Sequence, residues 1–129
     1  MTRDEITLTL PRRRAYYEIA HLVLGGLAIR LDVTVEHLDD LQVALASVLE
    51  HHDADGELTV ALRVENRAIH TLVGPFAGDR LRAALDREPG EELSLRRLLD
   101  TVVDGYAVEE RDGKEWIELT KAFEVVAEA

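Results

Sequence analysis

The chain has 129 residues, of which 47% are hydrophobic and 32% are charged, and its formal net charge is −11. This length fits one domain with one core, which we expect residues 1–129 to form. The lack of cysteine excludes disulfides, thiolate catalysis and Cys-bearing zinc sites, and the acidic charge argues against nucleic acid as a partner.

We expect no segment that would direct the chain to a membrane. No apolar run reaches the roughly 18 residues that a membrane-spanning helix requires. The acidic pair Asp4-Glu5 stands where a signal peptide would carry its basic region. We therefore expect a cytoplasmic protein that does not associate with a membrane.

The first half of the chain predicts one strand followed by two helices. Ile6–Leu10 alternates and is rich in β-branched residues, which is typical of a strand, and Pro11 ends it. Helical spacing over Arg13–Leu31 predicts an inward face made of Tyr16, Ile19, Ala20, Val23, Leu24 and Leu27. The pair Gly25-Gly26 either weakens this helix or lets another backbone approach closely. A second helix over Val35–His52 has an inward face made of Leu38, Leu41, Leu45, Val48 and Leu49.

The second half predicts two hairpins separated by two helices. The strands Leu58–Val64 and Ala68–Val73 pair across a turn at residues 65–67, and Gly74-Pro75 breaks the chain after them. The remaining elements are a helix over Asp79–Asp86, a turn at Glu88-Pro89-Gly90, a helix over Leu93–Val103, and a hairpin of Val108–Arg111 and Glu115–Lys121 around Asp112-Gly113. The order β-α-α-β-β-α-α-β-β predicts an α+β two-layer sandwich, with a mostly antiparallel five-stranded sheet and helices on one face.

The second predicted helix ends in a polar cluster, His51-His52-Asp53. Adjacent histidines on a helix point about 100° apart, so they do not chelate one ion easily, although Asp55, His37 or His70 could join after folding. A nucleophile–base pair of Ser47 and His51 is a second alternative, since residues four apart on a helix can touch. The sequence signals no oxyanion hole for such a pair. We favour a polar helix end, where the helix dipole suits histidine, and we expect no metal.

Four segments of the chain, in this order, resemble the anti-sigma-factor serine kinases of the GHKL superfamily, which share the histidine-kinase-like ATPase fold. The segments are ITLTLP, LDDLQVALASVLEHH, LTVALRVENRAIHTLVGPF and LRRLLDTVVDGYAVEERDGKEWIELTKAF, the last including Asp104 and ending in Leu119-Thr120-Lys121. The resemblance implies a bacterial regulator of transcription. Its partner would be a sigma factor or an anti-anti-sigma protein, and a homodimer is one arrangement that the resemblance allows.

The departures from this family concern its ATP site. In active members the second helix carries a Glu that acts as general base and, one turn later, an Asn whose oxygen holds magnesium on the ATP phosphates. Those positions fall on Ser47 and His51. Serine cannot act as a carboxylate base, and histidine prefers softer metals than magnesium. Taking Glu50 as the base instead places Ala54 at the metal position and turns Glu50 to the wrong side of the helix.

Two further nucleotide motifs are also changed. The family has an Asp-x-Gly-x-Gly motif after the hairpin, whose glycines let the backbone approach the nucleotide. This sequence keeps only Gly74 near that place, and no Asp closely precedes it. The glycine-rich phosphate loop is replaced by residues 91–97, EELSLRR, whose two carboxylates would repel phosphate. We therefore expect a non-catalytic protein that uses no cofactor. The alternative is a residual ATP-dependent protein serine kinase with an altered site, which would need ATP and magnesium.

The start of the first helix is the candidate surface for a protein partner. In this family the first strand and helix contribute to contacts between subunits and with partners. The resemblance therefore assigns partner binding to Arg12, Arg13, Arg14, Tyr16 and Tyr17. The residues alone leave two alternatives for the basic run, a solvated helix start or a docking patch for an acidic partner. Trp116 is likewise either a half-buried sheet residue or an interface anchor.

Overall fold

The computed structural model describes residues 4–51, 56–77, 80–86 and 94–123. Its nine elements follow the predicted order, and their type is as the sequence pattern indicates. They are β1 (Asp4–Pro11), α1 (Arg14–Arg30), α2 (Val35–Leu49), β2 (Glu57–Glu65), β3 (Ala68–Phe76), α3 (Arg80–Asp86), α4 (Leu95–Val102), β4 (Gly105–Arg111) and β5 (Lys114–Ala122). The predicted turn at Glu88-Pro89-Gly90 lies outside the described residues.

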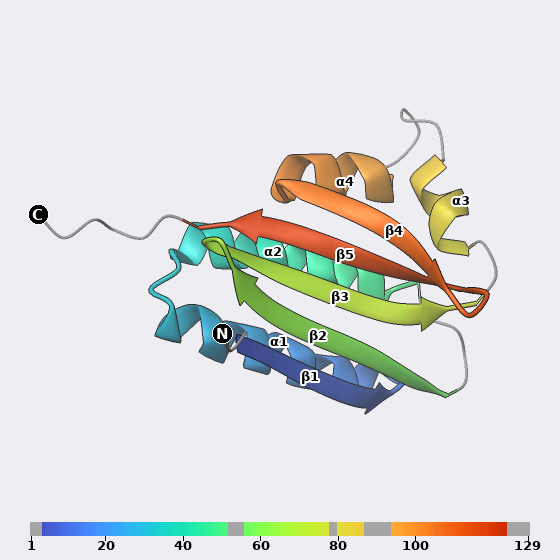
Figure 1. The fold of residues 1–129 in the computed structure, drawn as a ribbon, viewed down its shortest axis with the longest axis horizontal. Coiled ribbons are helices and arrows are strands. Elements are labelled where there is room, and N and C mark those ends of the chain that lie inside the picture. Colours follow the sequence, from blue (N-terminus) through green and yellow to red (C-terminus); the bar gives the residue numbers. More distant parts are fainter. Residues whose placement is uncertain (1–3, 52–55, 78–79, 87–93, 124–129) are drawn as a thin grey trace, which may run out of the picture.

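The five strands form one sheet in the order β1-β2-β3-β5-β4, and every neighbouring pair is antiparallel. Figure 1 shows the helices on one side of this sheet, with α1 and α2 behind β1, β2 and β3 and the other two near β4. The predicted two-layer α+β architecture is therefore confirmed. The opposite side of the sheet, which we call the outer face, carries no helix in the described part of the chain.

The core lies between the sheet and the helices. Alternation along each strand sends one set of side chains inward, as in β2, where Leu58, Val60 and Leu62 are all fully buried. Helix α2 supplies the other half of this core through Leu41, Ala44, Leu45, Val48 and Leu49. A side-chain cap begins α2, since the Thr34 hydroxyl accepts a hydrogen bond from the His37 backbone N–H at 3.2 Å. The helix ends at Leu49, three residues before the predicted end.

The predicted inward face of α1 is partly wrong. Tyr16 and Ile19 are exposed, whereas the helix buries Tyr17, Ala20, Leu24 and Ala28. The error has a physical cause, because α1 carries apolar residues around its whole circumference and its periodicity therefore does not select one face. Gln42 of α2 helps to set the observed rotation, since its side-chain amide donates to the His21 carbonyl at 2.9 Å.

The predicted break at Gly74-Pro75 is also wrong, because β3 continues through both residues to Phe76. The Gly74–Pro75 peptide bond is cis. The pairing of β3 with β5 shifts register between Val73 and Phe76. Proline has no N–H to give to a ladder, and such an irregularity is where a sheet tolerates it. Phe76 consequently reaches the core, where it is fully buried.

Both predicted hairpin turns are confirmed, and they differ in the strain that they carry. Asp112 and Gly113 have φ of 54° and 76°, while Asn66 and Arg67 have φ of 52° and 57°. Positive φ at both central positions defines the two-residue hairpin turn whose twist matches that of the strands. This turn favours the sequences Asn-Gly and Asp-Gly. Arg67 therefore holds a conformation that favours glycine.

Replacing Arg67 with glycine is expected to raise the free energy of unfolding by about 1 kcal/mol, because the left-handed conformation costs a residue with a side chain about that much. The reverse change at the other turn, Gly113→Ala, should lower the free energy of unfolding by a similar amount. Urea denaturation of both variants measures the two effects. Stabilities that change in the same direction would contradict this account of the turns.

Candidate functional site

Ser47 and His51, which the resemblance places at the family's general-base and magnesium positions, lie at the end of α2. Ser47, Glu50 and His51 of this segment border a cavity of about 220 Å³. The facing wall comes from α3 and α4, and it consists of Ala84, Ser94, Leu95 and Leu98. The structure thus brings Ser47 and His51 to one cavity, as their spacing predicts.

The chemistry of Ser47 in this cavity is limited by its own helix. Its hydroxyl donates to the Val43 carbonyl, four residues earlier, at 2.9 Å. The hydroxyl proton is therefore committed to the backbone, and the structure does not show the Ser47–His51 hydrogen bond that a nucleophile–base pair would need. Serine at this position offers no carboxylate for proton abstraction, and its hydroxyl donates within its own helix.

Glu50 corrects one expectation from the sequence. It borders the cavity together with Ser47 and His51, and it also borders a larger groove between α1 and α2. The reason is that α2 ends at Leu49, so that Glu50 occupies the C-cap position and stands at the rim of both hollows. Glu50 therefore borders the cavity, whereas helical spacing predicts that it faces another side of α2.

Gly74 has a packing role on the outer face of the sheet. A Cβ built on it would lie 2.5 Å from Cδ2 and 2.8 Å from Cγ of the Trp116 indole. The indole of β5 thus rests directly on the β3 backbone, which only glycine permits. Trp116 itself is half-buried, as one of the two alternatives from the sequence stated. The guanidinium of Arg111 lies 5.5 Å from the centre of its ring.

The end of β5, which carries the family-like Leu-Thr-Lys ending, ties several elements together. The ammonium of Lys121 pairs with Asp40 of α2 at 3.2 Å and donates to the Val102 carbonyl of α4 at 2.9 Å. The Asp104 carboxylate accepts a hydrogen bond from the Ala122 backbone N–H at 2.7 Å. Lys121 thus joins β5 to α2 and α4, and Asp104 joins the start of β4 to the end of β5. These contacts give both residues a structural role.

The basic run at the start of α1 divides into a buried residue and two exposed ones. Arg12 is 8% exposed, and its guanidinium donates to the Pro75 carbonyl. Tyr17 is buried as well, whereas Arg13, Arg14 and Tyr16 are exposed. Of the predicted partner-binding set, Arg12 and Tyr17 are therefore buried, and Tyr17 lies on the inward face of α1 with Ala20 and Leu24. Partner binding by the exposed Arg13, Arg14 and Tyr16 stays a prediction.

A groove of about 690 Å³ runs between α1 and α2 beside this exposed part of the run. Arg14, Glu18 and His21 of α1 border it together with Glu50 of α2. Its floor is apolar and is made of Ala15, Tyr17, Ala46 and Leu49. Charges of both signs line its rim, so the groove does not select an anion or a cation by charge alone.

Tyr17 of α1 and Tyr106 of β4 have raised pKa values. Burial raises the pKa of Tyr17 above 10.0, and the nearby Arg12 guanidinium opposes the shift. Burial also raises the pKa of Tyr106, and the Asp100 carboxylate adds to this by its charge and by a hydrogen bond. In both cases the folded protein holds the phenolic proton more tightly than the unfolded chain does.

Stability is therefore expected to fall at alkaline pH. The contribution of each raised pKa is complete below the unfolded value of about 10, and it is lost as the pH rises through the folded value. Urea midpoints measured from about pH 8 to about pH 11 test this, and Tyr106→Phe should flatten the decline. An equally steep decline in Tyr106→Phe would exclude this tyrosine as its source.

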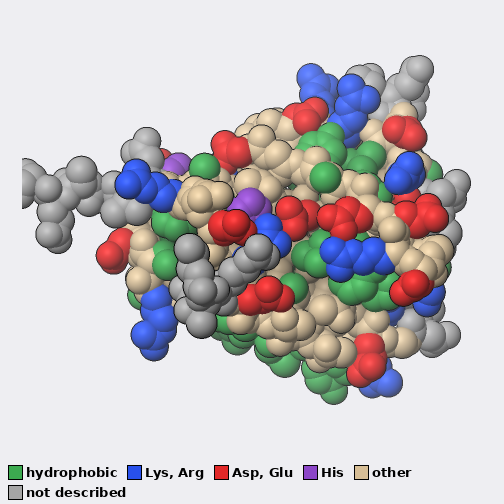
Figure 2. Space-filling model, viewed as in Figure 1, with side chains coloured by type: hydrophobic (Ala, Val, Ile, Leu, Met, Phe, Trp, Pro, Cys, Tyr) green, Lys and Arg blue, Asp and Glu red, His purple; other side chains and the backbone are tan. Residues whose placement is uncertain are grey.

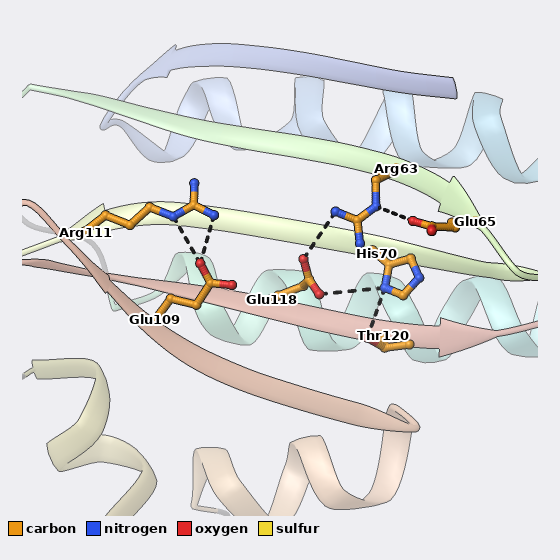
Figure 3. A network of polar contacts seen from close by, with 7 residues as sticks. All are labelled: Arg63, Glu65, His70, Glu109, Arg111, Glu118 and Thr120. Carbon is orange, nitrogen blue, oxygen red and sulfur yellow. Dashed lines mark hydrogen bonds and ion pairs between the residues drawn. The ribbon is translucent and has the colours of Figure 1, made fainter. Parts of the chain in front are cut away.

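A polar network that the sequence analysis did not identify crosses the outer face, as Figure 3 shows. Glu118 of β5 lies 3.7 Å from the Arg63 guanidinium and 3.8 Å from Nδ1 of His70. The same His70 nitrogen lies 3.2 Å from the Thr120 hydroxyl. Both contacts of His70 use one ring nitrogen, so this arrangement lacks the relay through two nitrogens that a catalytic triad requires. All four residues alternate with buried residues along their strands, so their side chains point to the outer face. This alternation is the signal from which the sequence could have indicated the network.

The histidines do not gather into a metal site in the described part of the chain. There, no group of three or more His, Asp or Glu residues is placed to hold an ion. His70 lies on the outer face, and His37 lies in the first turn of α2, so neither joins His51. Asp53, Asp55 and His52 are outside the described residues.

Comparison with known proteins gives partial matches to one kind of protein. The chain is 31% identical over 68 residues to the serine-protein kinase RsbW of Listeria innocua, a match covering 47% of this chain and 43% of that protein. It is 33% identical over 64 residues to the RsbW protein of Listeria monocytogenes, covering 44% and 41%. The matches therefore span less than half the length of these relatives. No family model matches the chain.

These matches support the resemblance to the anti-sigma-factor serine kinases at the level of the family. They agree with the fold, since the described elements form the α+β sandwich that the resemblance implies. None of the helices in the described segments is long and apolar enough to cross a membrane.

Proposed function

We propose that this chain is a cytoplasmic regulator of the anti-sigma-factor type, which binds a sigma factor or an anti-anti-sigma protein without transferring phosphate. The observation that carries the proposal is which residues occupy positions 47 and 51, at the end of α2. Ser47 stands at the general-base position with its hydroxyl bound to the Val43 carbonyl, and His51 stands at the magnesium position. Loss of both groups removes the proton transfer and the metal on which phosphoryl transfer depends.

The lining of the cavity supports the same proposal. Leu95 and Leu98 face α2 across this space, so its wall offers apolar groups where phosphates would need donors. Because the sheet and the helices share one core, we also propose that residues 1–129 form a single domain.

Two measurements on the purified chain test this function. Isothermal titration calorimetry with ATP and magnesium should give no saturable heat. Co-purification with the sigma factors and anti-anti-sigma proteins of the same organism should recover a complex at micromolar concentration. Failure to bind any of these proteins would refute the proposed partner, whatever the result with ATP.

A residual serine kinase is the second candidate function, and two observations favour it. The relatives are named serine-protein kinases, and Glu50 borders the cavity. In this case ATP binds, and Glu50→Gln lowers the phosphorylation rate by at least about 100-fold, as expected for loss of a general base. The control is Glu5→Gln, which removes an exposed carboxylate from the edge strand β1.

A further inference from the structure

The groove between α1 and α2, which lie side by side behind the sheet in Figure 1, has charged groups at its rim that the fold does not pair. Arg14, Glu18 and Glu50 make no side-chain hydrogen bond or ion pair within the described part of the chain. Arg14 and Glu18 are one helical turn apart and opposite in charge, a spacing at which such residues can pair. Their charges therefore remain available to a ligand in the groove.

His21 completes the rim, and its contacts show which ring nitrogen carries the proton. The side-chain amide of Gln42 donates to the His21 carbonyl at 2.9 Å, so the amide oxygen of Gln42 is turned toward Nδ1 of the His21 ring. An amide oxygen only accepts hydrogen bonds, so Nδ1 carries the proton and Nε2 of the neutral ring is a bare acceptor. No described residue occupies Nε2, which is the polar atom that His21 offers to the groove.

Acceptors outnumber donors among the polar side chains of this rim. The carboxylates of Glu18 and Glu50 and Nε2 of His21 accept hydrogen bonds, whereas Arg14 donates them. Glu18 and His21 are three residues apart and are therefore neighbours on one face of α1. A group with several N–H bonds can reach both. The arrangement of acceptors thus favours a protonated amine where the rim charges alone do not select a ligand.

The floor of the groove requires an apolar body on the same ligand. Ala15 and Ala46 leave space because their side chains are short, and the buried Tyr17 and Leu49 form the base. The volume of about 690 Å³ lies within the range of about 300 to about 1,000 Å³ that small-molecule sites occupy. The groove therefore has the size and the apolar surface for a small organic molecule.

The charge of the whole molecule acts in the same direction as the rim acceptors. The formal net charge is −11, and Figure 2 shows Asp and Glu side chains spread over the outer face, on the other side of the sheet from the groove. A summed negative field attracts cations and repels anions before any contact forms. A protonated amine is therefore favoured at long range as well as within the groove.

We propose that the α1–α2 groove binds a small organic molecule that carries a protonated primary amine on an apolar body. The ammonium donates to the Glu18 carboxylate and to Nε2 of His21, and the body covers Tyr17 and Leu49. Gln42 acts as a positioning residue, because it holds the proton on Nδ1 and so keeps Nε2 free. The inference goes beyond the proposed function, since it assigns a ligand to a groove outside the α2 cavity and its test needs neither ATP nor a sigma factor.

Calorimetric titration of the full chain with phenethylamine tests the class of ligand. We expect saturable binding with a Kd below about 1 mM. Phenethyl alcohol and phenylacetate keep the ring but replace the ammonium with a hydroxyl or a carboxylate, and ethylammonium keeps the charge without the ring. Each should bind at least about tenfold more weakly, because each lacks one of the two required parts. Absence of phenethylamine binding, or equal binding of any of the other three, would overturn the proposal.

Two variants with matched controls place the ligand in this groove. Glu18→Gln should weaken phenethylamine binding by at least about tenfold, because it removes a charged acceptor of similar size. Ala46→Phe should abolish binding by filling the floor. Glu36→Gln and Val43→Phe make the same changes at exposed positions of α2 that do not border the groove, and they should leave the affinity unchanged. Circular dichroism checks that all four variants are folded. Unchanged affinity in Glu18→Gln and Ala46→Phe would show that the amine binds elsewhere.

Nitrogen NMR of the His21 ring tests the positioning role without relying on affinity. The His21 signals, assigned by their absence from His21→Ala, should show a protonated Nδ1 and a bare Nε2 in the neutral ring, and phenethylamine should shift Nε2 more than Nδ1. Gln42→Leu should distribute the proton over both nitrogens. If the binding form then falls to about a third of the molecules, the Kd rises about threefold. A proton found on Nε2 in the unmodified chain would overturn the proposal.

Discussion

Replacing Gly74 with alanine is expected to lower the free energy of unfolding by about 2 kcal/mol. The new methyl carbon would lie 2.5 to 2.8 Å from three atoms of the Trp116 ring, one of them Cγ at its base. The ring cannot relieve this contact by moving its far end, so the indole or the β3 backbone has to shift. Urea denaturation followed by tryptophan fluorescence measures the effect, because Trp116 is the one tryptophan of the chain.

The control and the rescue for this prediction both lie in the same sheet. Gly105→Ala, at the start of β4, should change the free energy of unfolding little, because no atom lies within 4 Å of a Cβ built there. In a Trp116→Ala background, Gly74→Ala should lose most of its cost, which a double-mutant cycle measures. An undiminished cost in that background would show that the glycine is needed for a reason other than the indole.

The Gly74 contact bears on function as well as on stability. The resemblance leaves Gly74 as the one glycine near a changed nucleotide motif, and the structure places it under Trp116 on the outer face of the sheet, away from the α2 cavity. Contact with Trp116 therefore explains this glycine without a nucleotide. The packing explanation agrees with the proposed loss of ATP binding, which rests separately on Ser47 and His51.

Much of the fold could be predicted because the local patterns are strong. Strict alternation in β2, the Asp112-Gly113 turn and the apolar spacing of α2 each specify one element with little competition. Prediction failed where two signals conflicted. Gly74-Pro75 ordinarily ends a strand, but the register shift between β3 and β5 accommodates it. Helix α1 offers two apolar faces, and only packing against Gln42 and the sheet decides which one is buried.

The candidate site was harder to predict because it depends on tertiary placement. Spacing alone brings Ser47 and His51 to one side of α2, and the structure agrees. Spacing could not show that the Ser47 hydroxyl is bound to Val43 or that Glu50 stands at the rim of the cavity. The outer-face network of Arg63, His70 and Glu118 joins three strands, so no sequence window contains it.

The sequence also could not show that Arg12 is buried while Arg13 and Arg14 are exposed, and one variant tests this difference. Arg12→Ala is expected to lower the free energy of unfolding by about 2 kcal/mol, in the range for a buried hydrogen bond from a charged group. The Arg12 guanidinium donates to the Pro75 carbonyl, and its backbone N–H donates to the Gly56 carbonyl at 3.1 Å. The side chain therefore joins the ends of β1 and β3, and its aliphatic stem fills buried space that alanine leaves empty.

Arg13→Ala is the matched control, because Arg13 is the exposed neighbour in the same run. Its free energy of unfolding should stay within about 0.5 kcal/mol of the unmodified value. If the run also docks an acidic partner, Arg13→Ala should weaken that complex while the fold remains intact, whereas Arg12→Ala should affect the complex only through stability. Equal destabilisation by both changes would mean that burial does not distinguish these arginines. The two variants together thus separate the arginine that holds the strands from the arginine that remains available to a partner.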